Sequence, residues 1–341
     1  MSNKLLSIII PTYNMEKYLD KCISSLTDID ASLLELLDIL IIDDGSKDSS
    51  LSIANDYQRR FSNSIRVFDK SNGNYGSCVN MGLSHATGKY VKILDADDYF
   101  DTNEFEKYLS VMLTLDVDMI LNRVNIVNEE YDITAQWHFP ISDNAEVCYW
   151  DFIKDYGWLN MHMVAYKTEN IKKINYHQTE GISYTDQEWI HLPITTVETV
   201  FSIPVYLYQY LVGRAGQTMA VQSSKINKDY VIMLSALGNA WKEYNGPAHK
   251  KDFLKNKFIN QTMRRYDEFV RFSLYSQKDF RLFDKTMTSR FPILKDYSNR
   301  LTIHKWGGKI PFIRIWRNPV LYTLYRVVRK ILDLFLMLCY E

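Results

Sequence analysis

Short apolar runs alternate with amphipathic stretches through the first 125 residues of the chain. Several of the runs are apolar throughout, which is typical of parallel strands that are buried on both faces. They predict strands at Ser7–Ile10, Asp38–Ile42, Ile65–Phe68, Tyr90–Leu94 and Asp118–Leu121. Residues 15–26 and 48–61 lie between the first three strands and carry apolar residues at helical spacing. This order predicts an α/β protein with a mostly parallel sheet flanked by helices.

Three of the predicted strands are followed directly by polar residues. PTYN at 11–14 follows the first strand, DDGS at 43–46 the second, and DADD at 95–98 the fourth. Open α/β sheets bind their ligands beyond the carboxyl ends of the strands. We therefore expect these three segments to meet at one ligand-binding edge.

Three carboxylates crowd the last of these segments, those of Asp95, Asp97 and Asp98. Like charges this close raise one another's pKa unless a cation lies among them. Mg²⁺ and Mn²⁺ bind one or two carboxylates and complete their shell with water and phosphate oxygens. The pattern thus indicates a divalent cation and a diphosphate ligand, and the competing interpretation is a solvated turn with a helix cap.

The sequence contains no P-loop motif, and GNYGSC at 73–78 does not match the dinucleotide fingerprint.

The segments 7–14 (SIIIPTYN), 41–46 (IIDDGS) and 72–98 together resemble the nucleotide-binding half of family 2 inverting glycosyltransferases. The resemblance is to the bacterial polysaccharide and exopolysaccharide type, and it covers roughly the first 125 residues in order and spacing. It implies the GT-A fold, a UDP-sugar donor, and Mn²⁺ or Mg²⁺ as cofactor.

The resemblance also implies roles for individual residues. By it Asp44 hydrogen-bonds a uracil ring, Asp95 faces the ribose and the metal, and Asp97 coordinates the metal together with Asp95. Asp43 either contributes to the site or only shapes the turn before Gly45. The residues that would line the base pocket are Pro11, Thr12 and Tyr13.

GISYTDQEW at 181–189 resembles the acidic motif that supplies the catalytic base of the family, which would be Asp186. Thr185 stands where the family more often has Glu. The alternatives are Glu188 as the base, or a capping box formed by Thr185 and Glu188. A position in the first helical turn would lower the pKa of Asp186.

YLYQYLVGRAGQTMA at 206–220 resembles the segment that follows the base in the family. Arg214 is the only Arg or Lys between Lys173 and Lys225, which suits a contact with a diphosphate leaving group; the alternative is a loop salt bridge. Gln217 could close over the nucleotide. Trp158 and His162 lie where an acceptor pocket would form, and for both we favour a packing role.

These parts predict a metal-assisted single displacement onto a hydroxyl of a glycan or lipid-linked glycan, with inversion at the anomeric carbon. The expected division is a nucleotide-sugar-binding half at 1–125, an acceptor-binding half at 126–220 and a basic helical region at 221–341. Two alternatives stay open: a sugar-phosphate nucleotidyltransferase, whose glycine-rich signature loop is missing from PTYNMEKY, and a non-catalytic sugar-nucleotide-binding module.

Charge is distributed unevenly along the chain. Residues 1–220 hold 17 Lys and Arg against 31 Asp and Glu, whereas residues 221–341 hold 23 against 10. An apolar stripe over 319–340, with aromatic and basic residues before it, predicts either a helix at an anionic membrane surface or ordinary packing. No nucleic-acid partner is expected.

The four scattered cysteines indicate a reducing compartment. We therefore expect a cytoplasmic protein, which would be peripheral at the inner face of the cell membrane if the helix docks there.

Overall fold

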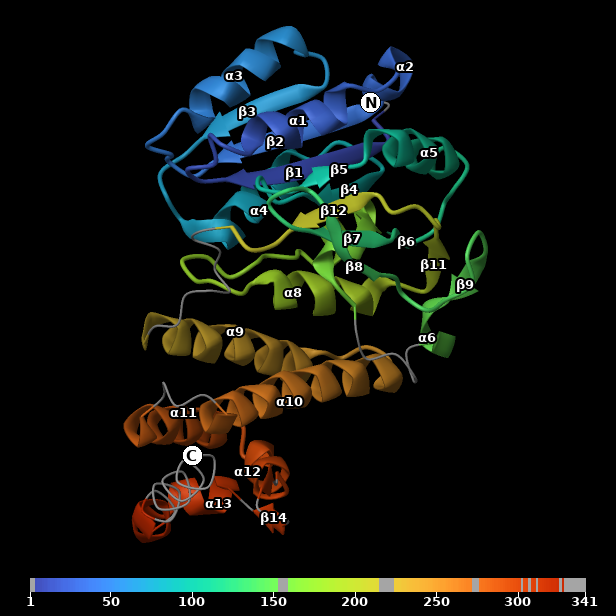
Figure 1. Cartoon of the computed structure of the whole chain (residues 1–341). Helices are drawn as coiled ribbons and strands as arrows, with labels where there is room; N and C mark the ends of the chain where they lie inside the picture. The colour runs from blue at the N-terminus through green and yellow to red at the C-terminus, as the bar shows by residue number, and fades with distance from the viewer. Residues whose placement is uncertain are drawn as a thin grey trace, which may run out of the picture. The chain divides into compact units, whose positions relative to one another are not determined.

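The computed structural model describes residues 4–152, 159–214, 224–271, 276–301, 303–305, 308–310, 312–324 and 327. The chain divides into two compact units, Met1–Val221 and Gln222–Glu341 (Figure 1). Trp158, Gln217 and most of the predicted helix 319–340 lie outside the described residues, so those predictions stay predictions.

An eight-stranded sheet forms the centre of the N-terminal unit, in the order β3-β2-β1-β4-β10-β6-β11-β9. The pairs β1–β2, β2–β3, β1–β4 and β6–β11 are parallel. The strands are β1 Leu6–Thr12, β2 Leu37–Asp43, β3 Ile65–Asp69, β4 Tyr90–Ile93, β6 Met119–Leu121, β9 Glu146–Cys148, β10 Val164–Lys167 and β11 Thr199–Ser202. All five predicted strands are therefore present, and the predicted mostly parallel α/β sheet is confirmed.

Three strands of this sheet, β9, β10 and β11, have no counterpart among the predicted strands, and β10 matters most for the site. β10 lies between β4 and β6 and runs antiparallel to both. The chain reaches this position only after a long excursion through residues 126–160, so local periodicity carries no signal of the pairing. As a result, the segment just before β10, residues 160–163, is brought next to the end of β4.

Helices pack around this sheet. They are α1 Leu19–Thr27, α2 Ala31–Leu34, α3 Ser50–Arg60, α4 Asn74–His85, α5 Thr102–Met112, α6 Tyr149–Phe152, α7 Thr168–Lys173 and α8 Asp186–His191, with short 3₁₀ turns at Met161–Met163 and Pro193–Thr196. α1 begins at Leu19, later than the predicted residue 15. α4 packs closely on β1, because a Cβ at Gly82 would come within 2.5 Å of the Ile9 side chain.

A second sheet of four short strands, in the order β5-β12-β7-β8, completes the N-terminal unit. Its strands are β5 Tyr99–Phe100, β7 Val124–Val127, β8 Ile133–Trp137 and β12 Tyr208–Leu211. β5 follows the acidic segment directly and pairs antiparallel with β12. This pairing brings the tyrosine-rich strand at 206–211 next to the clustered aspartates.

The C-terminal unit is helical, as predicted, apart from the small hairpin of β13 Ile303–Lys305 and β14 Gly308–Ile310. Its helices are α9 Ser224–Glu243, α10 Ala248–Arg271, α11 Gln277–Arg290, α12 Ile293–Asn299 and α13 Phe312–Arg317. Arg317 donates two hydrogen bonds to Asp284, at 2.9 and 2.6 Å, which tie α13 to α11. Within the described residues, no helix has the length and apolar character needed to cross a membrane.

Candidate active site

The three polar segments meet at one edge of the large sheet, as predicted. β1, β2 and β4 are parallel, and Thr12 at the end of β1 pairs with Asp43 at the end of β2. The Asp44 N–H donates a hydrogen bond of 2.8 Å to the Thr12 carbonyl, which joins PTYN to DDGS. The DADD segment follows β4 at the same edge. The carboxyl ends of these strands therefore form one rim.

The three aspartates of the acidic segment have different surroundings, and Asp98 is the most buried. Its carboxylate accepts hydrogen bonds from the Tyr208 hydroxyl at 2.7 Å and from the Leu211 N–H at 2.8 Å. Burial, followed by the charges of Asp97 and Asp95, holds the pKa of Asp98 well above its usual range. Asp98 thus anchors the acidic segment to β12.

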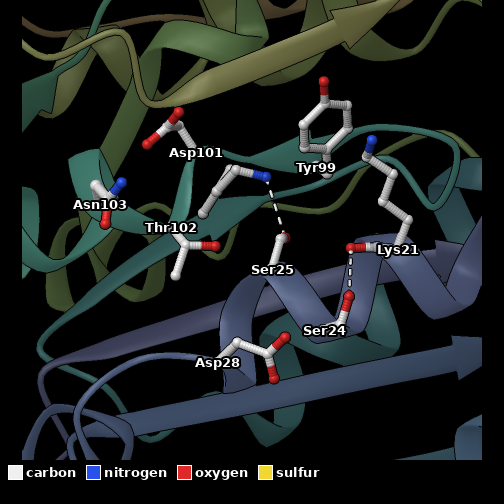
Figure 2. A pocket seen from close by; sticks show the side chains of 9 residues that line it. Lys21, Ser24, Ser25, Asp28, Tyr99, Asp101, Thr102 and Asn103 are labelled. Atoms are coloured by element: carbon white, nitrogen blue, oxygen red, sulfur yellow. Dashed lines mark hydrogen bonds between the residues drawn. The ribbon is translucent and has the colours of Figure 1, made fainter. Parts of the chain in front are cut away.

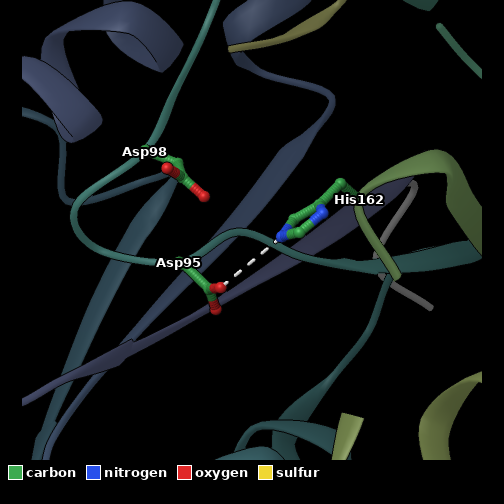
Figure 3. Close-up of side chains that lie close together, drawn as sticks. All are labelled: Asp95, Asp98 and His162. Atoms are coloured by element: carbon green, nitrogen blue, oxygen red, sulfur yellow. Dashed lines mark ion pairs between the residues drawn. The ribbon is translucent and has the colours of Figure 1, made fainter. Parts of the chain in front are cut away.

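Asp95 accepts a hydrogen bond of 2.6 Å from the Tyr75 hydroxyl. Figure 3 shows the His162 ring directed at Asp95, and the ring Nε2 lies 3.8 Å from a carboxylate oxygen. His162 stacks on Tyr210 with 4.4 Å between ring centroids, and its Nδ1 is buried without a hydrogen-bond partner in the described part of the chain. His162 is thus buried and packed on the rings of Tyr208 and Tyr210, in line with the packing role that we favour, and its Nε2 faces Asp95.

Asp97 forms an ion pair with Arg214, and the two side chains are only 12% and 13% exposed. Burial and the charge of Asp95 raise the pKa of Asp97, while Arg214 counteracts them. The cation beside the acidic segment is thus Arg214, the lone guanidinium that the sequence singled out. Arg214 forms the salt bridge considered as its alternative, and the partner is the predicted metal ligand itself.

The residues at this rim suit a hard divalent cation. Their donor atoms are carboxylate oxygens and an imidazole nitrogen, and within the described residues the three side chains of Asp95, Asp98 and His162 bring ligand atoms within 4.8 Å of one another (Figure 3). Burial, and after it the charges of neighbouring aspartates, raises the pKa values of Asp97 and Asp98, and a bound cation would offset both effects. Of the predicted pair Asp95 and Asp97, this group contains only Asp95, because Asp97 faces Arg214.

The predicted nucleotide residues lie at the ends of β1 and β2. The Asp44 carboxylate accepts hydrogen bonds from Lys70 Nζ at 2.6 Å and from the N–H groups of Gly73 and Asn74, each at 2.9 Å. Tyr13 is 45% exposed, which leaves its ring open to a ligand. The roles of Asp44 and of the base-pocket residues stay predictions.

Asp43 shapes the turn that follows β2. One of its carboxylate oxygens accepts a hydrogen bond of 2.9 Å from the Ser46 N–H, and Gly45 between them has a φ of 74°. Its other oxygen is buried without a partner among the described residues. This geometry favours the turn-shaping interpretation.

Asp186 is the first residue of α8. The capping box considered as an alternative is not formed: the Thr185 hydroxyl accepts a hydrogen bond of 2.7 Å from Gln178, and Glu188 accepts one of 2.9 Å from the Thr179 N–H. Burial raises the pKa of Asp186 above its usual value, so the expected lowering by the helix dipole is wrong. Burial is the largest influence on this carboxyl group. The charge of Asp95 adds to the increase.

The loop before Asp186 is held by α4. Asn80 on α4 accepts a hydrogen bond of 2.8 Å from the Gln178 N–H and donates one of 2.9 Å to the Gln178 carbonyl. The Gly181 N–H donates to the Gly73 carbonyl at 3.0 Å. A Cβ at Gly76 would lie 2.1 Å from the Thr179 carbonyl oxygen. α4 thus sets the position of the loop that precedes Asp186.

We expect the substitution Gly76→Ala to damage both stability and activity. The added methyl group must push the Thr179 backbone away from α4, and overpacking of this kind costs about 1–3 kcal/mol. The midpoint and slope of urea unfolding would measure the loss. Ser84→Ala, an exposed position on the same helix, is the matched control. Equal unfolding midpoints for the two variants would contradict this account of the helix–loop contact.

Sequence reasoning missed Lys92, which lies in β4 and is fully buried. Its ammonium donates hydrogen bonds to Asn122 at 2.8 Å, to the His162 carbonyl at 2.9 Å and to the Val164 carbonyl at 3.2 Å. Burial holds the pKa of Lys92 well below its usual range. Lys92 therefore fixes the segment that carries His162. The available signal was a lysine inside the apolar run that precedes the three aspartates.

Comparison with known proteins agrees with this geometry. The sequence model of glycosyl transferase family 2 matches residues 7–176. The uncharacterized glycosyltransferase MG025 of Mycoplasma genitalium is 40% identical over 108 residues, which are 31% of this chain and 36% of that protein. The minor teichoic acid biosynthesis protein GgaB of Bacillus subtilis is 35% identical over 104 residues, 30% of this chain and 11% of GgaB. The matched segment thus spans about a third or less of these relatives.

Solved structures extend the likeness beyond that segment. S. aureus TarS 1–349 in complex with UDP-GlcNAc has a TM-score of 0.67 at 19% identity and covers 86% of this chain and 83% of its own. The mannosyltransferase PcManGT of Pyrobaculum calidifontis, in complex with GDP-Man and Mn²⁺, has a TM-score of 0.50 at 12% identity, with 86% and 82% covered. At these identities the likeness concerns the fold, and it agrees with the predicted GT-A architecture. The chain belongs to glycosyl transferase family 2.

Proposed function

We propose that the protein is an inverting glycosyltransferase that moves a sugar from a UDP-sugar donor to a hydroxyl of a glycan or lipid-linked glycan. The observation that carries the proposal is Asp186, a carboxylate whose pKa is raised by burial and which interacts with Asp95 at the rim. A base with a pKa closer to neutrality than that of a free carboxylate is better matched to proton transfer at physiological pH. The S. aureus TarS structures, which contain UDP-GlcNAc or UDP, support the choice of donor.

The proposed reaction is a single displacement. The acceptor oxygen attacks the anomeric carbon of the donor while Asp186 takes the proton of the acceptor hydroxyl. The bond between the anomeric carbon and the diphosphate oxygen breaks, and UDP leaves with that electron pair. The ring passes through an oxocarbenium-like state, and one displacement inverts the anomeric configuration.

Asp97 and Asp95 would hold Mn²⁺ or Mg²⁺ in this proposal, with Asp98 and His162 adjacent. When bound, such a cation neutralises charge on the diphosphate. Arg214 is paired with Asp97 in this structure, and its planar, permanently charged guanidinium also suits a phosphate. We propose that Arg214 exchanges the carboxylate for a donor phosphate oxygen, so that it binds the leaving group.

Thermal unfolding with a panel of nucleoside diphosphates tests the donor and the cation together. UDP should raise the melting temperature more than CDP, ADP or GDP, and Mn²⁺ should increase the UDP effect. A ligand present at a hundred times its dissociation constant stabilises the fold by about 2.7 kcal/mol. Absence of any UDP-dependent shift, with and without Mn²⁺, would refute the proposal. A UDP shift without turnover across UDP-sugars and glycan acceptors would instead indicate a non-catalytic binding module.

We further propose that the protein acts at the cytoplasmic face of a membrane, docked through its C-terminal unit. The supporting observations are the basic balance of residues 221–341 and a group of exposed apolar side chains. Their exposed fractions are 66% for Val320, 45% for Leu321, 56% for Leu324 and 52% for Val327. Basic residues beside apolar ones are typical of segments that lie in a membrane interface.

The double substitution Leu321→Glu and Leu324→Glu should release the protein from vesicles that contain anionic lipid, measured by cosedimentation. Point substitutions are preferable to deletion of 305–341, because deletion would remove Trp316, which is buried against Phe280. Leu282→Glu, at an exposed position on α11, is the matched control. Unchanged sedimentation of the double variant would count against docking through this segment.

A further inference from the structure

A second pocket lies beside the acidic segment, between α1 and the start of α5 (Figure 2). Its volume is about 320 Å³, near the lower end of the range for small-molecule sites, about 300–1,000 Å³. It is lined by Lys21, Ser24, Ser25, Asp28, Tyr99, Phe100, Asp101, Thr102 and Asn103. Tyr99 follows Asp98 directly, and the thiol of Cys22 lies 3.8 Å from the Asp95 carbonyl oxygen. The pocket is therefore built from α1 and from the segment that follows the acidic residues.

The Lys21 ammonium defines one wall of the pocket. It lies 3.2 Å from the ring centroid of Tyr131 and 4.2 Å from that of Tyr99, and it forms no ion pair or hydrogen bond among the described residues. Tyr131 is held at a φ of 66°, a conformation that costs an aromatic residue free energy. Strain of this kind is common where a loop must present a side chain at a functional surface. Tyr131, at the tip of the β7–β8 hairpin, thus shares the Lys21 ammonium with Tyr99 of the pocket.

Several polar groups face this pocket without internal partners. The side chains of Asp28, Thr102 and Asn103 make no hydrogen bond in the part of the chain that the structure describes. Asp101 differs, because it accepts a hydrogen bond of 3.0 Å from the Glu104 N–H and so caps α5. Convergent polar groups beside an aromatic ring are typical of a site that orients a small polar ligand.

Charge decides which polar ligand suits the pocket. Two carboxylates, those of Asp28 and Asp101, stand against the single ammonium of Lys21, so an anion would meet net repulsion. The Lys21 ammonium offsets one of the two carboxylate charges and leaves the pocket with a small net negative charge. Hydroxyl groups can donate to the carboxylates and accept from the ammonium and the Asn103 amide, and the face of a pyranose ring can pack on the Tyr99 ring. A neutral, hydroxyl-rich ligand satisfies all of these groups.

We propose that this pocket binds a neutral sugar residue of the acceptor glycan, an inference that rests on the proposed function. The volume suits one or two sugar rings. A sugar held here would belong to a part of the glycan away from the reacting hydroxyl, because the pocket is lined by α1, β5 and α5 and by none of Asp95, Asp97 and Asp98. The pocket would then contribute to the choice of acceptor without touching the reacting atoms.

Saturation-transfer NMR on the full chain tests the proposal, with UDP and Mn²⁺ present to occupy the donor site. The probes are the methyl β-glycosides of glucose, galactose and N-acetylglucosamine. At least one should receive saturation from the protein. Ser24→Tyr, which fills the pocket, should abolish the signal, and Asn103→Ala should weaken binding about three- to tenfold through loss of a hydrogen bond. Ser110→Tyr, at an exposed position of α5 outside the pocket, should leave the signal unchanged.

Three outcomes would refute the proposal that the pocket binds a sugar: no signal from any glycoside, a signal that survives Ser24→Tyr, or displacement of the glycoside by inorganic phosphate.

The thermal shift with UDP distinguishes failure of this proposal from failure of the proposed function. A UDP shift without a glycoside signal refutes only the proposal that the pocket binds a sugar. Absence of the UDP shift refutes the proposed donor, whatever the glycosides do.

Discussion

The substitution Asp186→Asn should reduce the rate of sugar transfer by about a hundredfold to ten-thousandfold, the range that general acid–base groups contribute. Asparagine keeps the shape of the side chain, and its amide oxygen can still accept the hydrogen bond that Gln187 donates at 2.8 Å. It cannot take a proton from the acceptor hydroxyl. Initial rates with the donor and acceptor identified by the nucleotide panel would measure the loss.

The pH dependence of the wild-type rate should follow the same residue. Because burial raises the pKa of Asp186 above its ordinary value of 3.8, transfer should fall as the pH drops through the raised pKa. Stability should change in the opposite sense. The folded state binds the proton more tightly than the unfolded chain, so the contribution of Asp186 to stability is present below 3.8 and is lost as the pH rises through the folded pKa. Asp186→Asn should remove that dependence.

Glu188→Gln is the matched control for the base. Glu188 was the other carboxylate considered for this role, and one of its oxygens accepts the Thr179 N–H at 2.9 Å. Glutamine can accept the same hydrogen bond, so we expect a rate within a few-fold of wild type. Full activity in Asp186→Asn, or an equal loss in both variants, would show that the base is not Asp186.

The substitution Asp97→Ala should abolish transfer while leaving UDP binding without Mn²⁺ measurable. Loss of the metal ligand removes several kcal/mol of transition-state stabilisation, and about 4 kcal/mol corresponds to about a thousandfold in rate. The increase in the UDP thermal shift caused by Mn²⁺ should disappear as well. Single-turnover rates and the melting temperature with and without Mn²⁺ give two separate measurements.

Two further variants separate charge from metal binding in this experiment. Asp97→Asn keeps the side-chain shape and a hydrogen-bond acceptor for Arg214, which would otherwise lose its buried carboxylate partner. Asp116→Ala removes an exposed carboxylate that pairs with Lys89 and Lys167, and it should change neither measurement. A Mn²⁺ effect that persists in both Asp97 variants would assign the metal to Asp95, Asp98 and His162 instead.

The three aspartates show which features of the site could be predicted from the local sequence and which could not. Their position after a buried strand was predictable, because short apolar runs specify strands and parallel strands end at one edge. The distinct surroundings of the three were not. Asp98 is engaged by Tyr208 and Leu211, and Asp97 by Arg214, all more than a hundred residues away in the chain. Only the pairing of β5 with β12 brings those groups to the acids.

The contacts of Lys92 and His162 likewise could not be predicted from the local sequence. The apolar run around Lys92 predicted β4, whereas the hydrogen-bond partners of its ammonium come from Asn122 and from the segment before and within β10. That segment reaches β4 because β10 enters the sheet antiparallel. The direction of the Asp186 pKa shift was likewise mispredicted, because burial depends on everything packed around the residue and the helix position is only one local term.

The sequence by itself determined five strands of the large sheet, the rim where three of them end, the family and the identity of the clustered acids. Each of these depends on short-range patterns: apolar periodicity, which follows from backbone geometry, and motifs whose residues are close in the chain. Tertiary structure alone decided which acid anchors the loop, which pairs with Arg214 and how burial changes their proton affinities. Those properties depend on groups brought together by strand pairing and helix packing, and the free energy of a buried charge is set by its neighbours in space.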